Sequence, residues 1–220
     1  MTETPLPRPF DAVLCDIDNV IRHYDPSPLT ALERAVGLAE GTTARIAFAP
    51  EVDMPLLLGE ITPREWVESI AAAFARQGVL GAADARPLAA TLAASPFAAD
   101  QAVVGLLRRI RGEAGLPLVL VSNASVDLED DLAALGLIDL ADHVVSSARV
   151  GVAKPDPRIY AIAVDHAGVA AERCLFVDDS RENVDAALAL GMSALHYREP
   201  DDLRDALAPA FTTTQLRPAP

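Results

Sequence analysis

The sequence predicts a three-layer α/β/α fold, in which helices cover both faces of a parallel β-sheet. Two observations indicate this. From Ala98 onward, amphipathic helical patterns alternate with short apolar runs, and one more apolar run, Ala12–Cys15, lies near the N-terminus. Short runs that are apolar throughout are typical of strands buried on both faces of a sheet. Strands that alternate with helices form right-handed crossovers, and these produce a parallel sheet.

The expected elements follow from the same patterns and from the glycines that end the helices. The predicted strands are residues 12–15, 116–121, 143–146, 174–177 and 193–197. The predicted helices of this part are 99–113, 126–135, 158–167 and 182–190, with a short one from Asp201. Residues 212–220 are polar and rich in proline, so we expect a flexible tail.

Residues 24–95 differ in composition from the rest of the chain. They are rich in Ala and Leu at helical spacing and contain no clear strand. Helices are expected at 30–38, at 62–77, where Thr62-Pro63-Arg64-Glu65 forms a capped start, and at 83–94. We expect an inserted helical module whose own core contains Trp66, Phe74 and Phe48. The predicted core of the protein is then residues 1–23 and 96–211.

Composition limits the classes of partner. The 220 residues are half hydrophobic and carry a net charge of −14, with the basic residues scattered. This argues against nucleic acid and anionic membranes as partners. The N-terminus has no apolar run, and no window reaches the roughly 18 apolar residues of a membrane span. Cys15 and Cys174 lie in predicted strands, so we expect buried, reduced thiols and a cytoplasmic protein.

Polar residues of complementary kinds follow the predicted strands. They are Asp16 and Asp18, Ser122 and Asn123, Asp178 and Asp179, and Lys154 on a loop. Because the carboxyl ends of parallel strands share one edge of a sheet, these residues should converge. Close carboxylate pairs repel by about 4 kcal/mol at an effective dielectric constant of ~20, so the cluster requires a cation besides the lysine. An oxygen-only site without His or Cys indicates Mg²⁺, and a bound phosphate could then accept hydrogen bonds from Ser122 and Lys154.

Together these segments resemble the haloacid dehalogenase superfamily in its phosphatase form. Residues 16–21 (DIDNVI) are similar to its first motif, Ser122 to its second, 154–157 (KPDP) to its third and 176–180 (FVDDS) to its fourth. The order and spacing agree over about residues 10–197. The insertion resembles the early helical cap, called C1-type, that is mobile in this family. The resemblance implies a Rossmann-like core that cleaves a small phosphorylated metabolite with Mg²⁺.

The resemblance also implies a role for each motif residue. Asp16 would be the nucleophile that forms an aspartyl phosphate. Asp18 would act as acid and then as base, and its backbone carbonyl would bind the metal. Ser122, with Asn123, would hold the phosphate, and Lys154 would offset charge. Asp16 and Asp179 would complete the metal shell, with Asp178 as a direct or water-mediated helper.

Two residues near the motifs need comment. Asn19 stands where the family often has Gly, and Asn tolerates left-handed backbone geometry better than most residues. Asn183 either supports the site from behind the acids or lies on a helix surface, and the helix surface is favoured.

Alternatives to a phosphatase stay open. A phosphomutase or other phosphotransferase would keep every motif. A dehalogenase of the superfamily lacks the second acid of the first motif and needs no metal, so Asp18, Asp178 and Asp179 argue against it. A receiver-like phospho-switch is disfavoured by the long insertion. The substrate, the oligomeric state and which of Phe48, Arg45, Met54 and Trp66 face the acids do not follow from the sequence.

Overall fold

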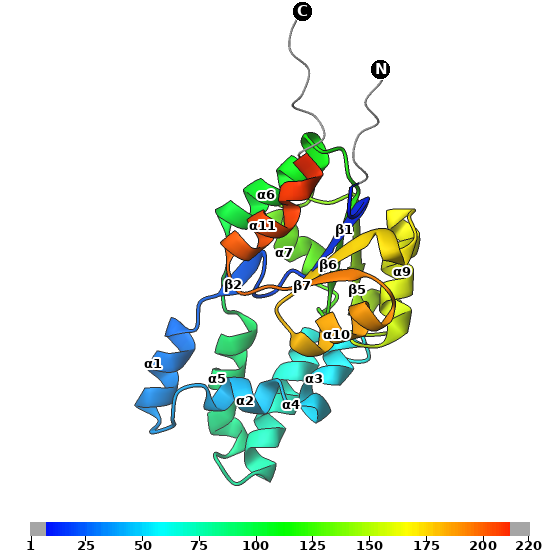
Figure 1. The fold of residues 1–220 in the computed structure, drawn as a ribbon. Coiled ribbons are helices and arrows are strands. Elements are labelled where there is room, and N and C mark those ends of the chain that lie inside the picture. Colours follow the sequence, from blue (N-terminus) through cyan, green and yellow to red (C-terminus); the bar gives the residue numbers. More distant parts are fainter. Residues whose placement is uncertain (1–7, 212–220) are drawn as a thin grey trace, which may run out of the picture.

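The computed structural model describes residues 8–211, so the predicted tail lies outside the described part. A five-stranded sheet forms the centre, and its neighbouring strands are all parallel. Its order is β5 (His143–Ser146), β4 (Leu118–Ser122), β1 (Ala12–Cys15), β6 (Cys174–Asp178) and β7 (Ser193–His196). The predicted strands and the parallel sheet are therefore confirmed (Figure 1).

Helices cover both faces of this sheet. On one face, α6 (Gln101–Gly112), α7 (Leu128–Ala134) and α11 (Pro200–Phe211) pack against the odd-numbered side chains of β1. On the other face, α9 (Pro157–Ala167) and α10 (Arg181–Ala189) pack against its even-numbered side chains. Successive side chains of a strand point to opposite faces, so one buried strand supplies both cores. The three-layer α/β/α architecture is confirmed.

The position of β1 in the sheet favours a ligand-binding site at its carboxyl end. After β1 the chain builds β4 and β5 on one side of it, and β6 and β7 on the other. Ligands of open α/β sheets bind at such a switch point, outside the carboxyl ends of the strands. Asp16, Ser122 and Asp178 stand at or directly after the ends of the three central strands.

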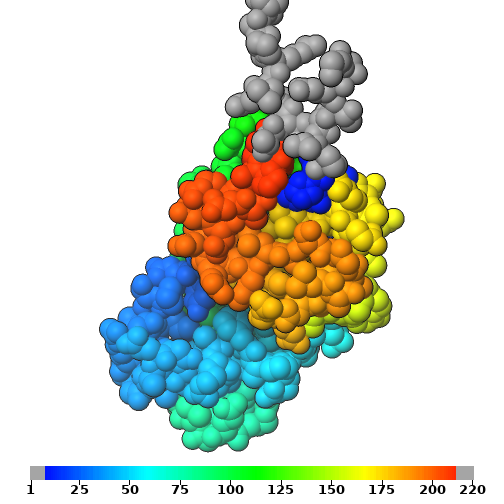
Figure 2. Space-filling view, in the orientation of Figure 1, coloured from blue at the N-terminus to red at the C-terminus, as the bar shows by residue number. Residues whose placement is uncertain are grey.

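The inserted segment contains five helices. They are α1 (Ser27–Ala35), α2 (Thr42–Ala47), α3 (Pro50–Leu57), α4 (Pro63–Arg76) and α5 (Ala82–Ala93). These helices share a hydrophobic cluster that is separate from the two clusters beside the sheet. The cap of α4 is as predicted, since the Thr62 side chain accepts from the backbone amide of Glu65 and the Glu65 carboxylate accepts from that of Thr62. Figure 2 shows the insertion, coloured blue to blue-green, as a lobe at the bottom of the view, beneath the core.

Several local predictions were wrong. Residues 22–24, where no strand was predicted, form β2 (Arg22–Tyr24), which pairs antiparallel with β3 (Phe97–Ala99). The chain leaves the core through β2 and returns to it through β3. Because these strands are far apart in the sequence, no local pattern could predict that they pair. Helices α2 and α3 were not predicted, because Gly41, Pro50 and Pro55 interrupt the helical pattern.

Two short elements, the last helix and the two cysteines complete the description. The short helix α8 (Ser147–Val150) and the 3₁₀ turn η1 (Ala171–Arg173) follow β5 and α9, and α11 is longer than the short helix expected there. Both cysteines are buried and free, as predicted. Within residues 8–211, no helix combines the length and the hydrophobicity that crossing a bilayer requires.

Candidate active site

Asp16 follows β1 directly and is held from both sides. Its backbone amide donates to the carbonyl of Val177 on β6 (2.8 Å), and the amide of Ile17 donates to its Oδ1 (2.7 Å). Ile17 is completely buried and anchors the turn. Asn19 has a φ of 60°, the left-handed geometry that Asn tolerates. The sharp turn thus fixes Asp16 at the sheet edge, with a side chain that is almost fully buried.

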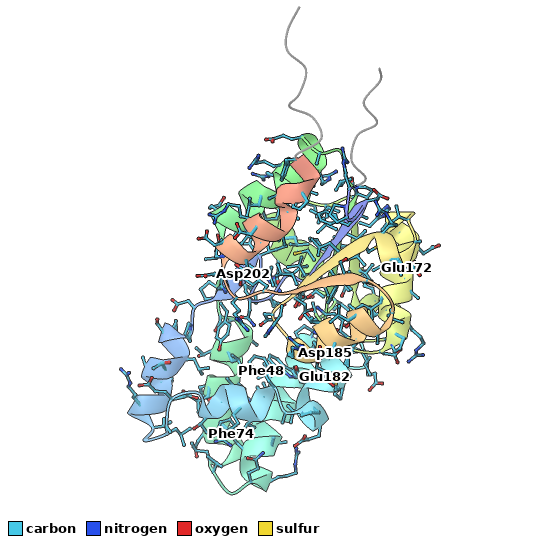
Figure 3. The ribbon with its side chains drawn as sticks, viewed as in Figure 1. Phe48, Phe74, Glu172, Glu182, Asp185 and Asp202 are labelled. Carbon is cyan, nitrogen blue, oxygen red and sulfur yellow. The ribbon has the colours of Figure 1, made fainter. Side chains whose placement is uncertain are left out.

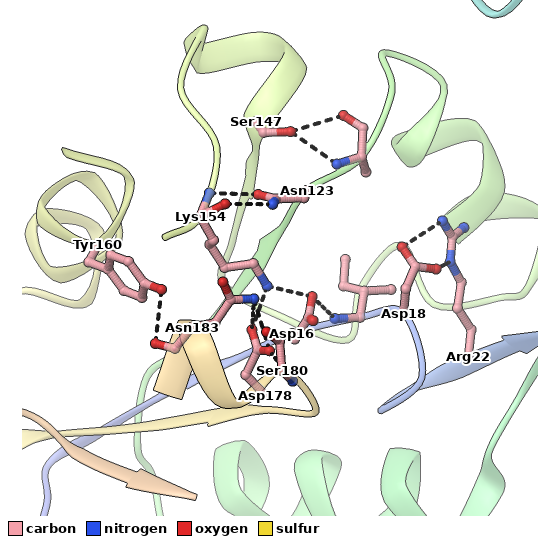
Figure 4. A network of polar contacts seen from close by, with 12 residues as sticks. Asp16, Asp18, Arg22, Asn123, Ser147, Lys154, Tyr160, Asp178, Ser180 and Asn183 are labelled. Atoms are coloured by element: carbon pink, nitrogen blue, oxygen red, sulfur yellow. Dashed lines mark hydrogen bonds and ion pairs between the residues drawn. The ribbon is translucent and has the colours of Figure 1, made fainter. Parts of the chain in front are cut away.

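Lys154 is the only lysine among the 220 residues, and it lies at the centre of the site. Its Nζ is 2.8 Å from Asp16 Oδ1 and 2.7 Å from Asp178 Oδ2, and only 1% of its side chain is exposed. Burial alone would lower the pKa of this ammonium group, but the two carboxylates raise its pKa overall. Lys154 is therefore a charged, buried cation between two acids (Figure 4).

The side chain of Asn123 holds the backbone of Lys154. Its Nδ2 donates to the Lys154 carbonyl (2.9 Å), and its Oδ1 accepts from the Lys154 amide (2.7 Å). This links the loop after β4 to the loop that carries the lysine. A contact between Asn123 and phosphate stays a prediction, because both polar groups of its side chain already have partners.

Asp178 ends β6 and is fully buried among donors. Its carboxylate accepts from Lys154 Nζ, from the backbone amide of Ser180 (2.8 Å) and from Asn183 Nδ2 (3.0 and 3.2 Å). The expectation that Asn183 lies on a helix surface was wrong: it is buried, and its backbone carbonyl accepts from the Tyr160 hydroxyl (3.0 Å). Asn183 thus positions Asp178, and sequence reasoning had no signal for this beyond the spacing of five residues.

Asp179 brings a third carboxylate to the cluster. One oxygen each of Asp16, Asp178 and Asp179 lie within 4.8 Å of one another. Burial raises the pKa of the Asp179 carboxyl, and a hydrogen bond from the Asn19 side chain works in the opposite direction. In their ionised forms, three acids and one lysine leave two negative charges uncompensated, which matches the charge of one divalent ion. Hard oxygen ligands of this kind suit Mg²⁺, so the residues fit the predicted metal.

Ser122 closes the site from the side of β4. It is completely buried, and its Oγ has no hydrogen-bond partner among the described residues. Burying a hydroxyl without a hydrogen-bond partner costs free energy, so such groups usually bind a ligand or a water molecule. The loop after it is held by α8, since Ser147 Oγ accepts from the Ala124 amide (3.0 Å).

Asp18 is turned away from the other acids. Its Oδ1 accepts from Arg22 Nε (2.7 Å), and Arg22 Nη1 donates to Asp131 of α7 (2.8 Å). The guanidinium carbon also stands 3.8 Å from the centre of the Phe97 ring, and the arginine is buried. The side chain of Asp18 therefore does not join the predicted four-acid cluster, and its charge is balanced by Arg22. Sequence reasoning missed Arg22 and Asp131, because their contact spans 109 positions.

A cavity of about 740 Å³ separates the core from the insertion. Core residues line one side and insertion residues the other, and the lining includes Asp18, Arg22, Phe48, Asp53, Leu56, Leu57, Trp66, Phe97, Ser125, Asp127 and Asp131. Phe48 is 49% exposed, so the expectation that it belongs to the core of the insertion was wrong, whereas Phe74 is buried there. Figure 3 shows Phe48 on the core side of the insertion and Phe74 deeper within it. Phe48 and Trp66 face the cavity, and Arg45 and Met54 are not among its lining residues.

Comparison with known proteins places the chain in a family. The family model of haloacid dehalogenase-like hydrolases matches residues 10–191, and the chain belongs to this family. Phosphatase MT3486 of Mycobacterium tuberculosis is 38% identical over 41% of this chain and 43% of its own length. Haloacid dehalogenase-like hydrolase domain-containing protein 3 of Bos taurus is 31% identical over 70% of this chain and 63% of its own. The matches thus span about half the length of the curated relatives.

Solved structures share the fold. A HAD family enzyme of Bacteroides thetaiotaomicron, 18% identical, superposes with a TM-score of 0.68 over 90% of this chain and 98% of its own. The same enzyme has been solved in complex with magnesium and inorganic phosphate; that structure is 19% identical and has a TM-score of 0.64 over 86% of this chain and 94% of its own. The L-2-haloacid dehalogenase RSc1362 is 25% identical, with a TM-score of 0.64 over 84% and 85%. These structures and this chain therefore share one fold.

Proposed function

We propose that this protein is a Mg²⁺-dependent phosphohydrolase that cleaves a small phosphomonoester through an aspartyl phosphate. The observation that carries the proposal is the arrangement around Lys154: three carboxylates converge there, with two negative charges in excess. The buried Ser122 hydroxyl, which has no partner among residues 8–211, supplies a donor for a phosphate oxygen. Several matched relatives are named as phosphatases, among them Phosphatase MT3486.

Mg²⁺ would be held by Asp16, by Asp179 and by the backbone carbonyl of Asp18. Asp178 would assist directly or through water, because its oxygens already accept hydrogen bonds from Lys154, Ser180 and Asn183. When bound, the ion supplies positive charge that binds the phosphate dianion and favours its approach to a carboxylate.

In the first step, an oxygen of Asp16 attacks phosphorus, and the bond from phosphorus to the leaving oxygen breaks. The new bond makes an aspartyl phosphate, and the leaving oxygen takes a proton from Asp18, which acts in its protonated form after it has released Arg22. Asp18 lines the cavity between core and insertion, whereas Asp16 is not among its lining residues. This placement suits their roles, because the nucleophile must meet phosphorus and the acid must meet the leaving group.

In the second step, Asp18 takes a proton from a water molecule, and the water oxygen attacks phosphorus. The bond to Asp16 breaks, which releases inorganic phosphate and restores the carboxylate. Lys154 stays charged throughout and offsets the negative charge on Asp16 and the phosphate. Asn123 acts as a positioning residue for the lysine loop.

The helical insertion, residues 24–95, acts as the cap of this enzyme. It forms one wall of the cavity, and β2 and β3 connect it to the core as a paired stem. Its closure over a bound substrate would exclude water from the first step. Its mobility and C1 type are part of the proposal.

A dehalogenase activity is the second candidate, because L-2-haloacid dehalogenases are among the similar structures. A dehalogenase needs neither a metal nor a second acid, so the acids at 18, 178 and 179 favour the phosphatase. A phosphotransferase would use the same site and differ only in the acceptor of the phosphoryl group.

The deciding experiment measures hydrolysis of para-nitrophenyl phosphate with Mg²⁺, with excess chelator and with Ca²⁺. We expect turnover only with Mg²⁺ and inhibition by Ca²⁺, whose larger and looser shell misplaces the ligands. Chloride release from 2-chloropropionate, assayed in parallel, tests the second candidate. Full phosphatase activity in chelator, or chloride release without phosphate release, would contradict the proposal.

A further inference from the structure

The cavity beside Asp18 has features that would select among leaving groups, and the following inference rests on the phosphohydrolase function proposed above. Its insertion wall is apolar and aromatic. Phe48 and Trp66 are stacked with ring centres 6.2 Å apart, and Leu56 and Leu57 extend the same wall. At about 740 Å³ the cavity has the size of a site for a drug-sized or nucleoside-sized group, much larger than a short alkyl chain requires.

The charges of the cavity are strongly one-sided. Among its lining residues, all of them described, four carboxylates (Asp18, Asp53, Asp127 and Asp131) face one basic group, Arg22. Arg22 is not free to bind a ligand anion, because both Asp18 and Asp131 already bind it. The carboxylates of the cavity would thus repel an anionic leaving group, and no free basic group there would offset its charge.

Asp53 is the acid of the insertion in this cavity. Its carboxylate has no hydrogen bond or ion pair with any described residue, and burial raises the pKa of this carboxyl to about 6. The indole N–H of Trp66 is also without a partner among residues 8–211. The partly buried Asp53 carboxylate therefore stands unpaired beside an apolar wall, and a partly desolvated acceptor of this kind is stabilised by a ligand that donates a hydrogen bond to it.

We infer that the leaving group of the substrate is aromatic, is uncharged or cationic, and carries an amino or N–H donor that binds Asp53. The flat ring would lie against Phe48 and Trp66, and the donor would meet the carboxylate. Esters whose leaving group carries a carboxylate or a second phosphate would be poor substrates.

The test uses three benzyl phosphates that differ only in the para substituent: aminomethyl, ethyl or carboxylate. With Mg²⁺ fixed, the wild-type enzyme should show kcat/KM in the order aminomethyl, ethyl, carboxylate. Pairing a charged donor with a desolvated carboxylate corresponds to at least about tenfold between the first two. Asp53→Asn should remove most of that preference. Glu51→Gln, which removes an exposed acid of the same helix that does not line the cavity, should keep it.

A second readout does not depend on catalysis. Trp66 is the only tryptophan of the chain, so its fluorescence reports on the cavity alone. The corresponding benzyl alcohols should bind in the same order and change this fluorescence. Equal kcat/KM for the three esters, or a preference for the carboxylate, overturns the inference while leaving the phosphatase intact. Absence of turnover for every ester, para-nitrophenyl phosphate included, refutes the proposed function, and the binding order of the alcohols then decides on the cavity.

Discussion

Gly59→Ala should push the insertion away from the core. Gly59 has a φ of +72°, and a Cβ added there would stand 2.5 Å from the backbone carbonyl oxygen of Ala148 in α8. Cβ atoms are essentially never found closer than 3.0 Å to such an atom, and neither the Cβ nor the backbone oxygen can move by a side-chain rotation. The insertion and the core must therefore separate by at least about half an ångström. Displacement of about 1 Å in substrate-positioning parts of an enzyme can lower the rate about a hundredfold. We therefore expect kcat/KM for aromatic phosphates to fall by about ten- to a hundredfold.

The assay compares this variant with Gly78→Ala. Gly78 lies at the end of α4 with a similar φ of +66°, and nothing stands within 4 Å of an added Cβ. Both variants should lose about 1–2 kcal/mol of stability from the left-handed backbone of a non-glycine residue. Thermal melts establish that common loss, and steady-state kinetics measure the difference. If both variants retain the wild-type kcat/KM, or lose it equally, contact between the insertion and α8 does not control the cavity.

Three further predictions concern single charges. Lys154→Met should lower the free energy of unfolding by about 3–5 kcal/mol, because it leaves Asp16 and Asp178 buried without their cation. Arg149→Met, which removes an exposed ion pair, should change it little. Equal denaturant midpoints for the two variants would show that the buried ion pairs of Lys154 do not stabilise the fold. Asp18→Asn should slow formation of the aspartyl phosphate more for an alkyl phosphate than for para-nitrophenyl phosphate, because the nitrophenolate leaves with little proton donation. A burst experiment measures this step, and an equal decrease of its rate for both substrates would show that Asp18 is not the acid. Asp53→Asn should stabilise the fold, and by about 1 kcal/mol more at pH 7.5 than at pH 5. Burial raises the pKa of Asp53 to about 6 in the folded protein, above its value in the unfolded chain. The wild type therefore loses stability as the pH rises from the unfolded pKa through the folded pKa, whereas the asparagine variant does not. Chemical unfolding at both pH values checks this, and a gain that does not depend on pH would mean that Asp53 is not desolvated.

The core of the fold could be predicted because its signals are local. Each central strand is a short apolar run, and each carries its polar residue at or directly after its end, as Asp16 and Ser122 do. Parallel pairing then places those ends at one edge. The capped start of α4 is also a local signal, and it was predicted correctly at Thr62 and Glu65.

The parts that escaped prediction depend on distant contacts. The pairing of β2 with β3 joins residues on both sides of the insertion, and Arg22 reaches Asp131 across 109 positions. Asn183 was expected on a surface because a helical pattern with few apolar residues does not show which polar side chain turns inward toward Asp178.

The sequence by itself thus determined the parallel α/β core, the inserted helices α1, α4 and α5, and the polar residues at the sheet edge, because hydrophobic periodicity and the residues at strand ends are local features of the chain. Only the tertiary structure decided that Asp18 turns to Arg22 while Asp16 turns to Lys154, and that Phe48 and Asp53 face a cavity. The direction of a side chain at a junction depends on what packs opposite it, and that partner comes from another part of the chain.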